Sequence, residues 1–244
     1  MTKQKSNPKE VEEITTCKVG EIVLPGQIVD AVGVKEANKK NQVIVGPGLR
    51  KIGDRIVASK CGVLREMNGK IFWVDALGKR YLPARGEGVV GIVTKKMGDY
   101  FKVDVRAADA ALLHFLAFEG ATKKNRPEVN VGDVVYGKMV VESTDMEPEL
   151  VCINDEGRKT NMGVLSGGFV FRASLHLVRK ILQRDCPLLP SLGSAFNYES
   201  AIGMNGVIWV KSQDPVSTIA VSNAILSAET MTPEELTTFC ANLR

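Results

Sequence analysis

The residues with the clearest chemical potential in this sequence form a short basic loop. Lys123, Lys124 and Arg126 are separated only by Asn125, within the polar segment 118–127. Cations contact phosphate groups and aromatic rings stack on bases, which is how proteins hold single-stranded nucleic acid without reading its sequence. Rings that could provide such stacking occur in the preceding segments: Tyr100, Phe101, His114 and Phe115. The loop therefore predicts binding of single-stranded RNA through its phosphates.

Six residues are predicted to contact RNA: Lys123, Lys124, Asn125, Arg126, Phe101 and His114. The alternative is that the aromatic side chains belong to a core and that the cations only keep a loop soluble, because alternation along a strand sends half of its side chains inward. Charge composition does not decide between the two. The net charge is only +4, although residues 1–83 carry 15 Lys and Arg against 9 Asp and Glu.

The usual arrangements of catalytic and metal-binding residues are missing from the sequence. It has two histidines and five widely spaced cysteines with no CxxC pair, and no GxxxxGK[ST], HExxH or GxSxG motif. Asp99, Asp104 and Asp109 could be imagined as the metal site of a nuclease. However, Asp104 lies within an alternating strand pattern, where we expect a structural role, paired with a cation or a loop amide. The sequence predicts a non-enzyme with no metal and no cofactor.

The tetrapeptide Gly203–Gly206 invites comparison with the GxxG loop that clamps RNA in KH domains. Its flanks read as strands, and it contains no cation to meet phosphate. We therefore interpret it as a structural hairpin turn, with Gly203 at its start and positive φ angles at Asn205 and Gly206. Trp209, on the strand that follows, is predicted to be a buried anchor between domains and not a stacking platform.

The first two thirds of the chain are predicted to form β-strands, which would hold the candidate RNA-binding residues in place. Residues 1–17 are polar without periodicity and are expected to be a disordered lead. Residues 18–83 read as a small β domain, in which Gly26 follows Pro25 at the positive-φ position of a type II turn and is structural. Residues 84–160 contain five strand patterns with the spacing of an OB barrel. No apolar run approaches the length of a membrane span.

The last third, residues 161–244, is predicted to be an α+β domain. Helical spacing runs from 174 to 183, and the prolines at 187 and 190 are expected to end that helix. Two strand patterns follow at 198–202 and 207–211. Asp214 and Pro215 are expected to open a second helix, and the segment from Thr232 a third. The fold class is therefore mainly β with a C-terminal α+β domain.

These segments together closely resemble the S1/KH cap subunits of the eukaryotic RNA exosome. The similarity covers nearly everything after residue 18. Its most specific markers are Phe101–Val105, Phe118–Pro127, Asp145–Glu149, Gly203–Gly206 and Ile208–Val210. The basic loop resembles one branch of this family, whereas the cysteine pattern does not suit the zinc ribbon of the remaining cap subunit.

The resemblance implies an N-terminal β domain, an S1-type OB barrel and a KH-type domain. It implies docking on a six-membered ring of RNase PH-like subunits, beside the other cap subunits, in the nucleus, nucleolus and cytoplasm. Such a cap guides single-stranded RNA, while associated exoribonucleases degrade or process it. The resemblance also implies that the Gly-x-Asn-Gly element is structural and not an RNA clamp.

Two other functions compete with that of an exosome cap subunit. A free-standing OB/KH module, such as a translation or ribosome-maturation factor, would bind RNA without RNase PH-like partners. A nuclease would cleave RNA in the presence of magnesium. Co-purification separates the first two possibilities, and a cleavage assay tests the third.

Overall fold

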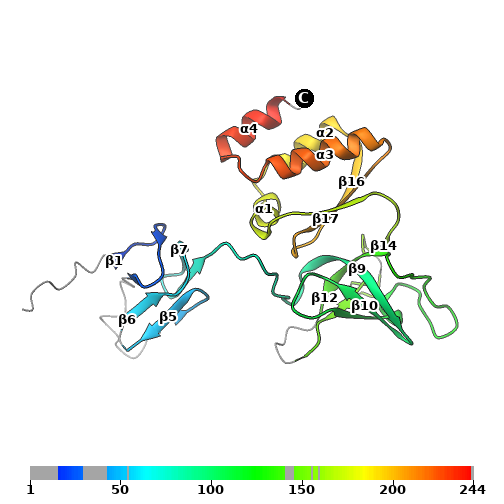
Figure 1. Ribbon diagram of the computed structural model, residues 1–244, viewed down its shortest axis with the longest axis horizontal. Helices are drawn as coiled ribbons and strands as arrows, with labels where there is room; N and C mark the ends of the chain where they lie inside the picture. The colour runs from blue at the N-terminus through cyan, green and yellow to red at the C-terminus, as the bar shows by residue number, and fades with distance from the viewer. Residues whose placement is uncertain are drawn as a thin grey trace, which may run out of the picture. The chain divides into compact units, whose positions relative to one another are not determined.

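The computed structural model describes residues 16–29, 43–53, 55–140, 146–154, 156–158 and 160–242. The chain divides into two compact units, residues 1–77 and 78–244 (Figure 1). The predicted disordered lead falls almost entirely outside the described residues. The fold class matches the prediction: a β domain, a five-stranded barrel and a C-terminal α+β region.

The first unit is built from two four-stranded sheets. The sheets have the orders β1-β3-β6-β5 and β2-β7-β8-β4. Their inner faces share one core, which includes Val23, Leu64 and Phe72. The strands are β1 (Thr16–Cys17), β2 (Ile22–Val23), β3 (Ile28–Val29), β4 (Ile44–Val45), β5 (Leu49–Ile52), β6 (Arg55–Ala58), β7 (Gly62–Met67) and β8 (Ile71–Asp75).

Two tight turns in this unit follow directly from their residues. Asn68 and Gly69, between β7 and β8, have φ angles of 55° and 64°, as a two-residue type I′ hairpin turn requires. Pro25 and Gly26 join β2 to β3. Gly26 has a φ of +94°, and its amide donates to the carbonyl of Ala58 at 2.8 Å. The second turn therefore passes the chain from one sheet to the other.

The second unit begins with a closed barrel. Strand β9 pairs with β10 and β12, β10 pairs with β11, and β13 joins β11 to β12, which closes the cycle; β14 extends β12. Fifteen buried residues fill the interior, among them Phe101, Leu113 and Met139. The elements are β9 (Gly88–Met97), β10 (Tyr100–Asp104), β11 (Ala111–His114), the 3-10 turn η1 (Phe115–Ala117), β12 (Val134–Met139), β13 (Glu149–Val151) and β14 (Gly163–Leu165).

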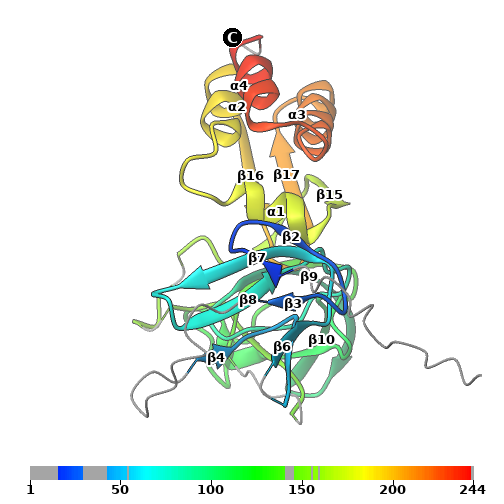
Figure 2. The same ribbon diagram turned by 90° about the vertical axis from the view of Figure 1, so that its left-hand side faces the viewer.

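An antiparallel sheet of order β15-β17-β16 and four helices form the rest of this unit. Figure 2 shows β16 and β17 reaching from α2, α3 and α4 toward the barrel. The elements are β15 (Phe169–Arg172), α1 (Leu175–Ile181), α2 (Leu188–Ala195), β16 (Tyr198–Ile202), β17 (Val207–Ser212), α3 (Pro215–Ser227) and α4 (Pro233–Asn242). None of the helices in the described part of the chain could cross a bilayer.

Three of these helices begin where the sequence places them, and one was not predicted. Ser174 accepts from the amide of Leu177 at the start of α1. Thr232 and Glu235 form a reciprocal capping box at α4, with distances of 2.8 and 3.3 Å. Helix α2 was missed because its two prolines were interpreted only as terminators. Pro187 precedes the helix and Pro190 lies in its first turn, where no intrahelical amide bond is needed.

The hairpin turn between β16 and β17 locks the α+β region onto the barrel. Asn205 is 1% exposed, and its Nδ2 donates to the carbonyls of Val90 at 2.7 Å and Val105 at 3.0 Å. The amide of Met204 donates to the carbonyl of Gly88 at 2.9 Å. A Cβ on Gly203 would lie 2.6 Å from the amide nitrogen of Val90 and would also clash with Asn205 Oδ1. The backbone at this turn therefore has to approach the barrel without a side chain.

The prediction of positive φ at both Asn205 and Gly206 was wrong for Asn205. Among the described residues, only Asn68 and Arg106 combine a positive φ with a side chain, whereas Gly206 has a φ of +77°. The Gly206 amide donates to the Gly203 carbonyl at 3.0 Å, so the turn needs the left-handed conformation only at its last residue. Asn205 serves the turn through its side chain and not through its backbone conformation.

Trp209 lies in a small cluster that both halves of this unit share. Its side chain is 4% exposed and packs with Val90 of β9, Ala201 and Val207, and with the half-buried Tyr136. The indole Nε1 donates to the carbonyl of Gly167 at 2.7 Å. The ring therefore fills the junction between barrel and sheet while its one polar atom is satisfied.

Gly26→Ala tests the backbone requirement of the turn between β2 and β3. No atom lies within 4 Å of the added Cβ, so the cost comes from the positive φ alone, about 1 kcal/mol. We expect amides of the first unit to exchange with solvent roughly fivefold faster by native-state hydrogen exchange. Gly78→Ala is the control, since its Cβ is equally free of contacts and its φ is not positive. Equal protection in both variants would contradict this assignment.

Trp209→Arg tests the junction. The substitution puts an unpaired charge into a buried site and leaves part of the volume unfilled, which together cost several kcal/mol. We expect a large drop in the melting temperature of the full chain. Trp209→Phe keeps an apolar ring but loses the hydrogen bond to Gly167, so we expect the free energy of unfolding to fall by about 1 kcal/mol. A Trp209→Arg variant that melts like the wild type and loses only RNA affinity would make Trp209 a stacking residue.

Candidate nucleic-acid interface

The basic loop is a compact turn whose two lysines project at its tip. It follows η1, and the side chain and backbone of Thr122 close it. The amide of Thr122 donates to the carbonyl of Asn125 at 2.9 Å, and the amide of Asn125 donates to Thr122 Oγ1 at 3.0 Å. Lys123 and Lys124 lie between these two residues and are exposed. The loop therefore presents two adjacent cations on a defined backbone.

Arg126 fastens the end of this loop to the barrel. Its Nη2 lies 3.0 Å from Asp99 Oδ1, in the turn between β9 and β10, and its Cζ lies 4.6 Å from the centre of the Phe115 ring. Both charged side chains are more than half exposed, so the pair contributes at most about 1 kcal/mol. The charge of the guanidinium is thus partly neutralised by Asp99, so Arg126 offers less free positive charge than the two lysines.

A chain of ring contacts leads from this loop, through the buried Phe115, to the barrel surface. Tyr100 faces His114 in the register of β10 and β11, with ring centres 4.7 Å apart at 76°. His114 stacks on Phe115 at the same distance and at 30°. The Nδ1 of His114 accepts from the amide of Leu116 at 3.1 Å, so the neutral ring carries its proton on Nε2. Tyr100 is 43% exposed and His114 is half-buried.

The predicted contact between Phe101 and RNA is wrong. Phe101 is 3% exposed in the interior of the barrel, and the Nζ of Lys96 lies 5.5 Å from its ring centre. Successive side chains of a strand point to opposite faces, so Tyr100 points outward because Phe101 points inward. The burial pattern of β10 shows this alternation from Tyr100 to Asp104. Tyr100, and not Phe101, is therefore the exposed ring of this strand that could stack on RNA.

Two further lysines on this surface were not predicted. Lys95 of β9 and Lys102 of β10 are direct cross-strand partners, two residues along the strands from the pair Met97 and Tyr100. Like charges directly opposite each other are unfavourable in the absence of an anion. Within the described residues neither lysine forms an ion pair. We give the name basic–aromatic strip to a set of exposed or half-buried residues on this surface: Lys95, Lys102, Tyr100, His114, Lys123 and Lys124.

Asp104 belongs to the junction and not to the strip. Its Oδ1 accepts from the amide of Arg106 at 2.9 Å. Arg106 has a φ of 60°, and its Nη1 donates to the carbonyl of Gly206 at 3.3 Å. Asp104 therefore stabilises a turn that contacts the β16–β17 hairpin. No cluster of three or more acidic, cysteine or histidine side chains that could hold a metal occurs among the residues described.

The α+β region does not present a typical KH clamp. Its connection between α1 and α2, residues 182–187, contains no glycine, although the clamp of KH domains is a glycine-flanked loop that approaches the RNA backbone. The tetrapeptide Gly203–Gly206 lies instead at the β16–β17 turn, against the barrel. RNA contact in this unit is therefore better supported on the barrel than on the helices.

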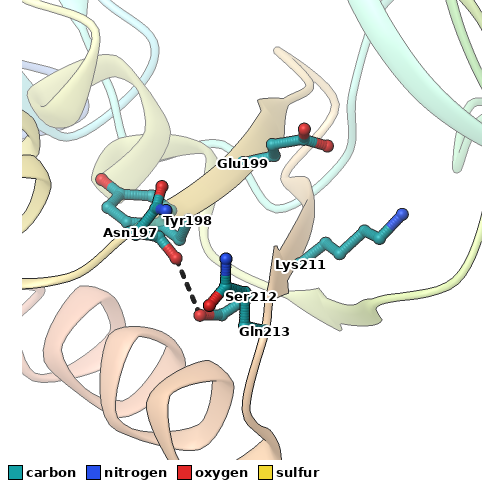
Figure 3. Close-up of a pocket in the computed structure, with 6 residues that line it drawn as sticks. All are labelled: Asn197, Tyr198, Glu199, Lys211, Ser212 and Gln213. Atoms are coloured by element: carbon teal, nitrogen blue, oxygen red, sulfur yellow. Dashed lines mark hydrogen bonds between the residues drawn. The ribbon is translucent and has the colours of Figure 1, made fainter.

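A small cavity lies at the other end of the same sheet, but it is not suited to RNA. It has a volume of about 200 Å³ and is lined by residues 197–199 and 211–213. Figure 3 shows Ser212 donating to the carbonyl of Asn197, at 2.8 Å, and one cation, Lys211, opposite one carboxylate, Glu199. The two charges balance, so this cavity offers no excess positive potential to a phosphate backbone.

Comparisons with known proteins agree with this architecture. Residues 19–77 match the family model "Mammalian exosome complex component RRP40, N-terminal", residues 81–163 match "Exosome complex component RRP40, S1 domain", and residues 168–216 match "KH domain". The chain is 45% identical to the exosome complex component RRP40 of Drosophila melanogaster, over 91% of this chain and 95% of that protein. It belongs to the RRP40 family of exosome complex components.

Other RRP40 relatives are also similar along most of their length. The identity to human exosome complex component RRP40 is 42%, over 89% of this chain and 88% of the relative. The Schizosaccharomyces pombe protein is 35% identical over 84% of this chain and 88% of its own length. A solved structure titled "Crystal structure of putative exosome complex RNA-binding protein" shares the fold. Its TM-score is 0.54 with 20% identity, over 68% of this chain and 97% of that chain.

Substitutions of Tyr100 and Phe101 separate the surface of this RRP40 family member from its core. We expect Tyr100→Ala to leave the melting temperature nearly unchanged and to weaken binding of single-stranded RNA by about 1–3 kcal/mol, the usual contribution of one stacked base. Phe101→Ala should cost about 3–5 kcal/mol of stability. Thermal melting and RNA titration check both results. Loss of stability with Tyr100→Ala and of RNA affinity alone with Phe101→Ala would reverse the assignment.

Proposed function

We propose that this RRP40 family member is a non-catalytic cap subunit that guides single-stranded RNA. The basic–aromatic strip supports this function most directly, because its lysines form no ion pair among the described residues and lie beside the exposed ring of Tyr100 and the half-buried ring of His114. Phosphate contacts of this kind fix the path of a strand and carry no base specificity. The bound RNA would continue to the pore of a ring of RNase PH-like subunits, where associated exoribonucleases process or degrade it.

The chemistry of the described residues favours guiding over cleavage. A hydrolytic site needs a nucleophile or metal-bound water, and a base positioned to take its proton. In the strip, the imidazole Nδ1 of His114 accepts from the Leu116 amide, and beside the strip the carboxylate of Asp99 is paired with Arg126. These groups hold the surface in shape. The proposed role is therefore to position the RNA, and its degradation would be carried out by partner nucleases.

The junction between barrel and α+β region supports a guiding role because it makes the surface rigid. The three hydrogen bonds from the Asn205 side chain and the Met204 amide cross from the hairpin to the barrel, and Trp209 packs beside them. A strand held on the barrel would then keep a fixed direction relative to the α+β region. Such a preformed path avoids an ordering cost when RNA binds.

Alanine at Lys123, Lys124 and Arg126 tests the electrostatic part of this proposal. Each neutralised phosphate contributes roughly 0.7 to the slope of log affinity against log salt on a single strand, so loss of three contacts lowers the slope by about 2. Because Arg126 is paired with Asp99, we expect the two lysines to account for most of the change. The measurement is titration of fluorescent poly-U at several salt concentrations.

The matched control removes Lys211 and Arg184 from the α+β region and should leave the slope unchanged. An unchanged slope in the loop variant would remove the loop from the RNA path. Co-purification with RNase PH-like subunits supports the cap role over a free-standing module. Magnesium-dependent cleavage by the purified chain would contradict the non-catalytic role.

A further inference from the structure

The segment that leads into the barrel carries a second group of cations. We call residues 78–86, which directly precede β9, the basic segment. Lys79, Arg80 and Arg85 within it are exposed, and none of the three forms an ion pair among the described residues. The basic segment itself contains no acid, and the first acid after it is Glu87. Positive charge is therefore concentrated here, apart from the basic–aromatic strip.

A buried tyrosine fastens the basic segment to the barrel. The ring of Tyr81 is 4% exposed in the barrel core, and its hydroxyl donates to Glu87 Oε2 at 2.7 Å. Burial and the neighbouring Glu87 raise the pKa of the Tyr81 phenol above its usual range, so the hydroxyl keeps its proton and remains a donor. The nearest acid in sequence is thus engaged in a contact within the protein.

A tight turn holds Arg85 on a defined backbone. The amide of Glu87 donates to the carbonyl of Ala84 at 3.3 Å, and Gly86 has a φ of +88°, as the third residue of a type II turn requires. Arg85 is the second residue of this turn. The amide of Gly86 also donates to the carbonyl of Met139 at 2.8 Å, which ties the turn to the end of β12. The arginine therefore projects from a fixed position.

The basic segment and the basic–aromatic strip lie toward opposite ends of β9. The segment joins β9 at Gly88, and Lys95 of the strip lies further along the same strand, at a distance of about 23 Å for a rise of about 3.3 Å per residue. Lys138 of β12 is the register partner of Gly88, and its Cε would lie 3.9 Å from a Cβ added at Gly86. A fourth cation therefore lies beside the turn, far from the strip.

We propose that Lys79, Arg80 and Arg85 form a second phosphate-binding site for single-stranded RNA. The inference rests on the proposed function, because a surface that guides a strand must contact it at more than one point to fix its direction. Two of the three side chains are guanidinium groups, whose planar forks suit bidentate contacts with phosphate. The one ring of the segment, that of Tyr81, is buried, so the site offers phosphate contacts and no stacking surface.

A protein partner fits the basic segment less well than RNA. The core of a protein interface is apolar and depleted of charged residues, with aromatic side chains enriched. Leu82 is the only large apolar side chain of the segment that is exposed, and cations lie on both sides of it in the sequence. The charge of the segment is instead complementary to a phosphate backbone.

RNA length separates this site from the basic–aromatic strip. An oligo-U of about 4 nucleotides, at the short end of the site sizes of OB folds, can fill the strip alone, whereas one of about 20 nucleotides can reach both surfaces. The test variant of the full chain carries alanine at Lys79, Arg80 and Arg85. We expect the slope of its log affinity against log salt to fall by about 2 for the long RNA, at roughly 0.7 for each phosphate contact, and its binding of the short RNA to stay unchanged.

Two controls accompany this variant. Alanine at Arg50, Lys51 and Arg55 removes the same three charges from exposed positions of the first unit and should leave both RNAs bound as in the wild type. Arg80→Lys combined with Arg85→Lys keeps the charge of the basic segment, so we expect its affinity for the long RNA to stay within about twofold of the wild type. All three variants should melt like the wild type, because the substituted side chains are exposed.

The outcomes separate this inference from the proposed function. An unchanged slope for the long RNA in the alanine variant would remove the basic segment from the RNA path, and an equal loss in the first-unit control would show that only net charge matters. Normal RNA binding with lost co-purification of RNase PH-like subunits would identify a protein contact instead. Failure of the wild type to bind either RNA would contradict the proposed function itself.

Discussion

The side chain of Asn205 connects the two halves of the second unit, one of which is the barrel that carries the proposed RNA surface. One amide group donates to carbonyls of two barrel segments that are distant in sequence, Val90 and Val105. Its Oδ1 is buried without a partner among the described residues. Leaving such an acceptor unsatisfied costs about 1–3 kcal/mol, so the two donated bonds and the packing of Trp209 must exceed that cost. A side chain with one donor could not make both contacts.

The same junction explains why a KH-like tetrapeptide occurs in this chain without serving as a clamp. Gly203 is needed because Val90 leaves no room for a Cβ, and Gly206 is needed because the turn ends in the left-handed region. Both requirements concern contact between protein segments. The conformational freedom that brings backbone close to phosphate in a KH loop here brings a hairpin close to a barrel.

Local sequence patterns predicted the elements well and the surfaces less well. The turn at Gly26 and the helix starts at Ser174 and Thr232 each have a short-range cause, so the sequence indicated them. Phe101 was predicted to lie on the surface because aromatic rings can stack on bases. Alternation along the strand, however, already places Phe101 and Tyr100 on opposite faces. The contact between Asn205 and Val90 could not have been found that way, because it joins residues that are 115 positions apart in the sequence.

We propose that RNA follows the basic–aromatic strip on a rigid scaffold and is not held by the α+β region. Ultraviolet crosslinking of photoreactive poly-U to the full-length chain, followed by mass spectrometry of the linked peptides, tests it most directly. We predict crosslinks at Tyr100, at His114 and within residues 118–127 that disappear as salt is raised. Crosslinks concentrated at residues 182–187 or at the cavity around Lys211, with the strip unlabelled, would contradict the account.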